Sequence, residues 1–369
     1  MRILFLINNL CNGGAERILV NLSNKLADDG YDVTVRCLVN EGINKDYLSN
    51  KVKYEYIFNK SFKGLNYLYK FPKTFIYNKV CYGNYDIIVP YLHGVLTRIV
   101  SYGPKEQKKI AWLHANMEKS PFIKGFRSKE EIQKCFSNYN KIVAVSEDVK
   151  NSFIKVSGID ENKVVVKYNT FDVDTIIEKS KEKVEKGIKN NCINICSVGK
   201  LEEVKGYKRL LKIYKRLSDK LPNTHLVLIG EGSQRKELED YITNNNLNEQ
   251  VDLIGFDSNP YKYVAKSDLF VCSSYSEGFS SVLAESTILQ IPAITTDCAG
   301  MKEILGENND YGIIVNNDEE SLYRGLEYLL TNKNELYYYE NKVKERGTFF
   351  STSNSVNGIE KMMCDIINE

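Results

Sequence analysis

The chain of 369 residues lacks the segments and residue clusters that mark several classes of protein. Its N-terminal apolar stretch, residues 3–8, is too short for a signal peptide or a membrane span, and no other stretch is long enough. It has only three histidines, and its nine cysteines are scattered, so no zinc-binding spacing occurs. We therefore expect a cytoplasmic protein with reduced thiols and no metal, neither secreted through a signal peptide nor membrane-spanning.

A strong net charge is also lacking, because the formal charge is +2, but the two halves differ. Residues 1–172 carry 26 Lys and Arg against 17 Asp and Glu, whereas residues 173–369 carry 24 against 31. The densest basic stretch, residues 51–79, holds seven lysines, one glutamate and many aromatic residues. It fits either a contact with an anionic membrane or a solvated lysine face whose rings point into the core. Nucleic acid is not an expected partner, because the net charge is small and no binding motif accompanies the stretch.

Short buried strands alternate with helix patterns in both halves of the chain, and a chain of this length is expected to form two cores. The strands expected in the first half are 2–8, 31–39, 86–92, 109–114 and 141–146. The scheme restarts in the second half with 193–199, 224–230, 251–256, 268–274, 293–297 and 311–315. These patterns predict an α/β protein with two Rossmann-like, doubly wound domains that face each other across a cleft.

The stretch SEGFSSVLAES (276–286) follows one expected strand and precedes the next, which predicts a loop and a helix at a strand's carboxyl end. Ser280 or Ser281 would cap this helix and leave its first N–H groups free. Glu277 lies on the loop, where open parallel sheets bind ligands, and Glu285 lies about one turn inside the helix. Two carboxylates beside a helix N-terminus suit a ligand with both hydroxyls and phosphates, such as a sugar nucleotide.

Two other loops that leave strands carry residues suited to phosphate. Lys200 and Lys205 could neutralise a diphosphate. Two lysines on a loop are more often solvated surface, but their expected position opposite the two-glutamate element, at the carboxyl edge of the same sheet, favours a functional role. Gly13 and Gly14 let the backbone approach a phosphate closely, with a plain tight turn as the alternative. The G-x-G-x-x-G fingerprint is absent, which disfavours a dinucleotide-dependent dehydrogenase.

The histidines and a pair of aspartates are the remaining candidates for chemistry. His114 ends a strand and could hydrogen-bond a sugar hydroxyl, orient an acceptor or act as a general base. We expect His225 to start a strand as a surface residue. Asp172 and Asp174 are spaced like metal ligands, but they lie at the domain junction and are interpreted as structural.

Together and in this order, a set of motifs resembles the retaining glycosyltransferases of family 4, which have the GT-B fold. The motifs are GGAER (13–17), WLHAN (112–116), AVSEDVK (144–150), SVGKLEEVKG (197–206), IGEGSQR (229–235), SEGFSSVLAES (276–286) and TTDCAGMKEIL (295–305). The resemblance spans nearly the whole chain. Its most specific element is the pair of glutamates with seven residues between them, Glu277 and Glu285.

The resemblance implies roles for individual residues. Glu277 would contact the hydroxyls of the donor sugar, and Glu285 would hold the nucleotide ribose. Lys205 matches the family's usual lysine at the diphosphate, and Lys200 stands where the family often has arginine, whose bidentate fork it lacks. His114 matches the active-site histidine. Further residues would line the donor site: Gly13, Gly14, Glu231, Arg235, Gly278, Phe279, Ser280 and Ser281.

The resemblance also implies a function. It predicts metal-independent, retaining transfer of a sugar, by default from UDP-hexose or UDP-N-acetylhexosamine, to a glycan acceptor, lipid-linked, in bacterial surface polysaccharide assembly at the inner face of the plasma membrane. Residues 1–172 would bind the acceptor and residues 173–349 the nucleotide sugar, with a C-terminal helix at about 350–369 packing back on the first domain. Two alternatives stay open: a GT-B sugar-nucleotide epimerase, and a non-catalytic GT-B partner subunit, which would be expected to lose parts of the donor site.

Overall fold

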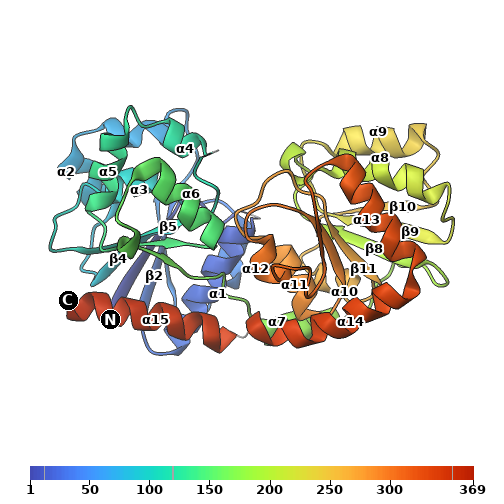
Figure 1. The fold of residues 1–369 in the computed structure, drawn as a ribbon. Coiled ribbons are helices and arrows are strands. Elements are labelled where there is room, and N and C mark those ends of the chain that lie inside the picture. The colour runs from blue at the N-terminus through green and yellow to red at the C-terminus, as the bar shows by residue number, and fades with distance from the viewer. Residues whose placement is uncertain (12, 119, 351) are drawn as a thin grey trace. The chain divides into compact units, whose positions relative to one another are not determined.

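The chain folds into two compact units, each built around its own parallel sheet (Figure 1). The first unit consists of Met1–Phe171 together with Thr352–Glu369, and the second consists of Asp172–Ser351. Each unit has the alternation of strands and covering helices of a doubly wound α/β fold. The computed structural model describes residues 1–11, 13–118, 120–350 and 352–369.

The first unit has a seven-stranded sheet with the order β3-β2-β1-β4-β5-β6-β7. Its strands are β1 (Arg2–Ile7), β2 (Asp32–Val39), β3 (Lys53–Phe58), β4 (Ile87–Pro90), β5 (Lys108–Leu113), β6 (Lys141–Ala144) and β7 (Val164–Val166). Its helices are α1 (Gly14–Asp28), η1 (Ile43–Tyr47), η2 (Leu65–Lys70), α2 (Lys73–Val80), α3 (Val95–Val100), α4 (Pro121–Lys124), α5 (Lys129–Ser137), α6 (Glu147–Ser157), η3 (Glu161–Lys163) and α15 (Thr352–Asn368). The strand order reverses between the paired strands β1 and β4, which is the topological switch point of this sheet.

The second unit has a six-stranded sheet with the order β10-β9-β8-β11-β12-β13. Its strands are β8 (Ile193–Val198), β9 (Thr224–Ile229), β10 (Val251–Gly255), β11 (Leu269–Cys272), β12 (Ala293–Thr296) and β13 (Ile313–Val315). Its helices are α7 (Val173–Ser180), η4 (Glu203–Lys205), α8 (Tyr207–Ser218), α9 (Arg235–Asn244), α10 (Tyr261–Val264), α11 (Ser281–Ile288), α12 (Met301–Leu305), α13 (Glu319–Thr331), α14 (Lys333–Gly347) and η5 (Thr348–Phe350). Here the order reverses between β8 and β11, which pair in parallel.

The amino-acid sequence explains why these sheets are parallel and covered on both faces. β11 is a short run of apolar residues whose side chains are all buried, and β1 is likewise apolar and buried after Arg2. Strands of this kind bury both faces under helices. In the second unit α8 supplies such a cover, because its buried side chains recur at helical spacing, at Leu210, Leu211, Tyr214 and Leu217.

The predicted class, an α/β protein with two doubly wound halves, is confirmed, but the sequence analysis missed two strands. β3 is an edge strand inside the basic stretch 51–79, and its half-exposed side chains conceal the apolar pattern. β7 is a strand of three residues just before the junction of the units. His225 lies at the start of β9 as expected, but the expectation of a surface residue was wrong, because it is 1% exposed and its Nε2 lies 2.9 Å from Asp252 Oδ2.

The last helix, α15, belongs to the first unit. It packs against α1 and buries an apolar stripe made of Val356, Ile359, Met363 and Ile366. This stripe has the spacing of one helix face, so the segment is ordered by apolar burial against the first unit.

Several features bear on membrane, metal and redox chemistry. No helix in the described part of the chain is long and apolar enough to cross a bilayer. The nine cysteines are free thiols. Among the described residues, no three His, Cys, Asp or Glu side chains converge as a metal site. Asp172 instead caps α7, accepting hydrogen bonds from the backbone N–H and hydroxyl of Thr175 at 3.0 and 2.7 Å.

A buried arginine ties the edge of the first sheet to the loop after α2. Arg36 of β2 is 1% exposed, and its Nε donates to Glu55 of β3 at 2.8 Å. Its Nη1 donates to the carbonyls of Val80 and Tyr82, both at 2.9 Å, and the guanidinium lies 3.6 Å from the centre of the Tyr82 ring. Burial opposes ionisation of Glu55, but hydrogen bonds from Lys53 and Arg36 outweigh it, so the pKa of Glu55 lies below its ordinary value.

The lowered pKa of Glu55 predicts a pH dependence of stability. A carboxyl group whose pKa is lower in the folded state stabilises the fold above its unfolded pKa, about 4.3, and loses this contribution as the pH falls through the folded value. We expect the free energy of unfolding to fall on acidification below about pH 4, and to fall less in Glu55→Gln. Urea denaturation at a series of pH values measures this, and an identical pH dependence in both proteins would contradict it.

Candidate active site

The element that carries both predicted glutamates is the connection from β11 to α11. β11 ends at Cys272, and α11 begins at Ser281 with Ser280 as its N-cap, as one of the two predicted caps. The Ser280 hydroxyl accepts a hydrogen bond from the Leu283 N–H at 3.4 Å, so this side chain is used in the cap. The side chain of Phe279 is buried, which leaves its backbone as the part that can meet a ligand.

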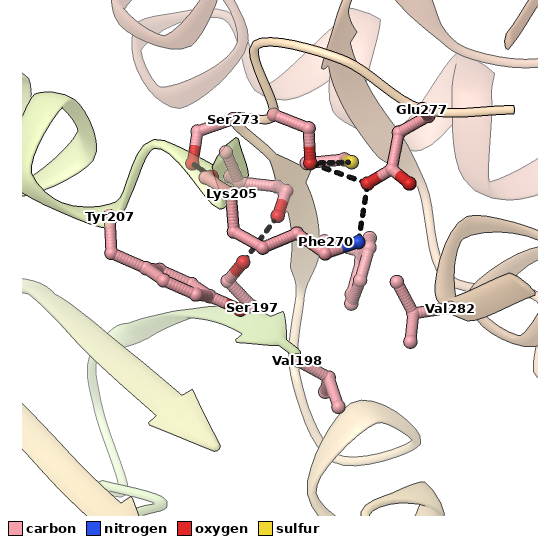
Figure 2. Close-up of a pocket in the computed structure, with 11 residues that line it drawn as sticks. Ser197, Val198, Lys205, Tyr207, Phe270, Ser273, Glu277 and Val282 are labelled. Atoms are coloured by element: carbon pink, nitrogen blue, oxygen red, sulfur yellow. Dashed lines mark hydrogen bonds and ion pairs between the residues drawn. The ribbon is translucent and has the colours of Figure 1, made fainter. Parts of the chain in front are cut away.

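Glu277 is bound by two side chains that come from the segments following two neighbouring strands. Lys205, which follows β8 at the end of η4, places its Nζ 2.6 Å from Glu277 Oε1. The hydroxyl of Ser274, just after β11, donates to the same oxygen at 2.6 Å. Figure 2 shows the Lys205 amine and the Glu277 carboxylate meeting. The second carboxylate oxygen, Oε2, has no hydrogen-bond partner among the described residues.

This cluster lies in a pocket at the carboxyl ends of β8 and β11 (Figure 2). The pocket is lined by Ser197, Val198, Lys205, Tyr207, Phe270, Val271, Cys272, Ser273, Ser274, Glu277 and Val282. Burial favours the neutral form of Lys205, but the Glu277 carboxylate outweighs it and raises the pKa of the amine above its ordinary value. The pocket has a volume of about 10 Å³, room for about one water molecule, so it does not itself enclose a nucleotide sugar. It brings together an ammonium group, a carboxylate and hydroxyls, the groups that bind negative charge and hydroxyls.

The loops after β8 and β9 lie against each other beside this pocket. The Leu201 N–H donates to the Glu231 carbonyl at 2.9 Å, which joins the two loops. Glu231 and Arg235 form an ion pair with each other, and Arg235 Nε also donates to Glu239 at 2.7 Å. Lys200 is exposed and does not line the pocket. The structure thus brings Lys205 to Glu277 but leaves Lys200 at the surface of a neighbouring loop.

Glu285 lies on α11, half-buried, outside the residues that line the pocket. Its Oε1 accepts a hydrogen bond from the hydroxyl of Tyr261 at 3.3 Å. The carboxylate is therefore held by a side chain of α10 while it stays partly open to solvent.

In the first unit, the predicted glycines open the first helix. Gly13 is the N-cap of α1 and Gly14 its first residue, so the N-cap residue has no side chain with which to cap the helix. A Cβ on Gly13 would clash with the carboxylate of Glu16, which therefore lies close over the glycine. Because Gly13 has no side chain, the Glu16 carboxylate has room to lie against its backbone.

His114 follows β5 and is held among aromatic rings. Its backbone N–H donates to Nδ1 of His93 at 3.4 Å, and its ring centre lies 4.8 Å from that of Tyr91. Burial, together with the neighbouring His93, lowers the pKa of His114 to about 3, so the imidazole is neutral at physiological pH. Its Nε2 is buried and has no hydrogen-bond partner among the described residues.

Ser274 is a site residue that the sequence analysis missed. Its hydroxyl stands three positions before Glu277, and serine on a strand-end loop is too common to single out.

Comparisons with known proteins place the chain in a family. The model described as "Glycosyltransferase Family 4" matches residues 12–175, and "Glycosyl transferases group 1" matches residues 178–346. The 4-alpha-N-acetylgalactosaminyltransferase of Campylobacter jejuni that is named for N-acetylgalactosamine-N,N'-diacetylbacillosaminyl-diphospho-undecaprenol is 36% identical over 206 residues. That match covers 55% of this chain and 53% of the relative, so the alignment spans about half of each protein.

A second curated relative aligns over the full length. It is the C. jejuni alpha-1,4-N-acetyl-D-galactosaminyltransferase named for GalNAc-alpha-(1->4)-GalNAc-alpha-(1->3)-diNAcBac-PP-undecaprenol, 24% identical over 100% of this chain and 99% of the relative. Among solved structures, Anabaena HepE in complex with UDP matches with a TM-score of 0.79 at 19% identity, over 99% of this chain and 100% of that one. WaaG, involved in lipopolysaccharide biosynthesis, matches with a TM-score of 0.75 at 17% identity, over 98% and 99%. The chain therefore belongs to glycosyltransferase family 4 and has the GT-B fold.

Proposed function

We propose that the protein transfers a sugar from a UDP-sugar to a lipid-linked glycan, with retention of configuration, in surface polysaccharide assembly. The observation that carries this proposal is the cluster of Lys205, Glu277 and Ser274 at the carboxyl ends of β8 and β11. It combines a cation for a diphosphate with a carboxylate for sugar hydroxyls. HepE, a structural neighbour, has been solved with UDP and with UDP-glucose, which supports uracil as the base of the donor nucleotide.

In this mechanism the second unit binds the donor. Lys205 lies at the diphosphate and stabilises the negative charge that grows as the sugar departs, with Lys200 adding charge from the surface. Glu277 keeps Oε1 on Lys205 and Ser274 and offers Oε2 to a sugar hydroxyl. The departing diphosphate accepts the proton of the acceptor hydroxyl, so that attack occurs on the face from which it leaves. Because lysine supplies the positive charge, the proposed reaction needs no metal ion.

The first unit binds the acceptor in this proposal. Two C. jejuni relatives are named for undecaprenol-linked glycans, which supports an acceptor of this kind. His114 has a neutral ring and an unpartnered Nε2, which suits a hydrogen bond with a substrate hydroxyl. A pKa of about 3 makes it a poor general base at neutral pH, so we assign it to orientation rather than proton transfer.

The membrane contact proposed for such an acceptor rests on an exposed surface of the first unit. Among residues 59–75, four aromatic side chains are exposed, namely Phe62 (43%), Tyr67 (59%), Phe71 (53%) and Phe75 (58%). Leu68, Ile76 and Tyr77 of the same region point into the core instead. Lys60, Lys63, Lys70 and Lys73 are exposed between the rings. We call these eight exposed lysine and aromatic side chains the lysine–aromatic patch.

The patch suits an anionic bilayer better than open solvent. Residues 56–85 contain five lysines and no Asp or Glu. The Glu41 carboxylate, which accepts a hydrogen bond from the Ser61 N–H at 3.2 Å, offsets only part of this positive charge. Exposed rings can insert at the level of the lipid headgroups, while each lysine near the surface contributes about 1 kcal/mol of attraction. We therefore place the protein at the cytoplasmic face of the plasma membrane, bound peripherally.

The donor assignment is tested with Glu285, for which we propose a hydrogen bond to the nucleotide ribose. Replacement by alanine removes the acceptor atoms for the ribose hydroxyls, so we expect Glu285→Ala to weaken UDP binding at least about tenfold. Isothermal titration calorimetry with UDP measures this, after a thermal-shift screen of wild type against UDP, GDP, ADP and NAD.

Glu249→Ala is the matched control, because Glu249 is an exposed glutamate just before β10, at the amino end of the strands. It should bind UDP as wild type does. Wild-type affinity in Glu285→Ala would refute the assignment of Glu285. Stabilisation of wild type by NAD alone, or by none of the four nucleotides, would argue for a non-catalytic partner subunit.

The membrane contact predicts that binding to vesicles depends on charge and on aromatic rings. The variant Lys63→Glu/Lys70→Glu/Lys73→Glu should lose nearly all binding to phosphatidylglycerol vesicles, since each lysine contributes about 1 kcal/mol. Phe71→Ser/Phe75→Ser should also weaken binding, although it keeps every charge. Cosedimentation with vesicles of phosphatidylglycerol and phosphatidylcholine measures both effects.

The matched control reverses three exposed lysines of the second unit, Lys181, Lys183 and Lys186, and changes the net charge by the same amount. Equal binding by the patch variant and this control would show that overall charge, and not the patch, determines adsorption. Unchanged binding by the patch variant would leave a solvated lysine face.

A further inference from the structure

Arg209 is a buried charge next to the proposed donor site that no proposed ligand contact uses. It lies in the first turn of α8, just beyond Lys205, and its side chain is 3% exposed. Its Nη2 donates to the carbonyl oxygens of Ser273 and, at 3.1 Å, Ser274. Both acceptors are backbone carbonyls and not a carboxylate, so Arg209 holds the backbone of residues 273 and 274 in position.

Asn317 links Arg209 to a further residue that follows β11. Arg209 Nη1 donates to Asn317 Oδ1 at 2.9 Å, and Asn317 Nδ2 donates to the Tyr275 carbonyl at 3.0 Å. The guanidinium of Arg209 also lies 4.0 Å from the centre of the Tyr275 ring. Arg209 and Asn317 together therefore contact three consecutive residues, 273–275, immediately before the loop that carries Glu277.

The same three residues contact the turn that carries Lys205. The Ser273 hydroxyl donates to the Lys205 carbonyl at 2.9 Å, and the Tyr275 N–H donates to the Val204 carbonyl at 2.7 Å. Gly206 has a φ of 69°, and a Cβ at this position would clash with the Ser273 carbonyl oxygen. The two chain segments thus touch through their backbones, and Arg209 binds the carbonyl at the point of contact.

We infer that Arg209 is a positioning residue for the donor site: it fixes residues 273–275 so that Ser274 and Glu277 meet Lys205. The inference rests on the proposed function for the identity of the ligand, but not for the geometry. A purely structural arginine would stabilise the fold and leave ligand affinity unchanged.

Arg36 offers a matched control in the same chain. It is also buried, donates to two carbonyls, Val80 and Tyr82, and lies over a tyrosine ring, but it belongs to the first unit. It contacts no residue of the Lys205–Glu277 site. Arg36→Lys therefore measures how stability, exchange and UDP binding change when a buried arginine away from that site is replaced.

The experiment compares Arg209→Lys, Asn317→Ala and Arg36→Lys with wild type. Hydrogen–deuterium exchange of residues 273–280 without ligand measures the order of the segment, and calorimetry measures the dissociation constant for UDP. Lysine keeps the charge of Arg209 but lacks the planar guanidinium fork that spans the carbonyls of residues 273 and 274 and Asn317, so we expect faster exchange of 273–280 and about tenfold weaker UDP binding. Asn317→Ala should change both in the same direction by less, and Arg36→Lys should lower the unfolding temperature without changing either.

The outcomes separate this inference from the proposed function. Unchanged exchange in Arg209→Lys would overturn the inference, as would faster exchange with an unaltered dissociation constant. If wild type does not bind UDP, the proposed donor is wrong, and exchange of 273–280 alone then decides the role of Arg209. If Arg209→Lys does not fold, Asn317→Ala decides it, because Asn317 is exposed and its replacement leaves the core intact.

Discussion

Strands β8 and β11 run side by side in parallel, although more than sixty residues separate them along the chain. Parallel pairing brings the carboxyl ends of both strands to one edge of the sheet, and the loops that follow must leave from that edge. Lys205 comes from one loop and Glu277 from the other, so their 2.6 Å contact exists because of the strand pairing. Every proposed donor contact in the second unit depends on this constraint.

The two proposed sites differ in the charge of a central side chain, which is positive for Lys205 and neutral for His114. In the second unit a lysine is kept charged by a carboxylate, since the Glu277 charge more than offsets the burial of Lys205. In the first unit His114 has no such partner, and burial keeps its ring neutral. The chemistry we propose uses both states, because a diphosphate requires positive charge and a sugar hydroxyl is oriented well by a neutral hydrogen-bonding group.

The sequence predicts the parts of the fold that local pattern encodes. The apolar run at residues 268–274 predicts a buried strand, and the serine after it predicts the start of α11. From such patterns Glu277 and Lys205 were predicted to lie at one edge of one sheet. Edge strand β3 was missed because an edge strand needs only a partly buried face. Arg209 could not be found this way, since its partners, the carbonyls of residues 273 and 274, are set by the tertiary fold and not by the identity of any neighbouring residue.

The ion pair between Lys205 and Glu277 also has a consequence for turnover. When the nucleotide product departs, the lysine loses the diphosphate that balanced its charge. An ammonium group without a counter-ion in a mostly buried pocket is unfavourable. Here Glu277 lies 2.6 Å from the ammonium group and balances its charge. The carboxylate that would bind the incoming sugar through Oε2 would thus stay the counter-ion of Lys205 through Oε1, and so would also ease the release of the outgoing nucleotide.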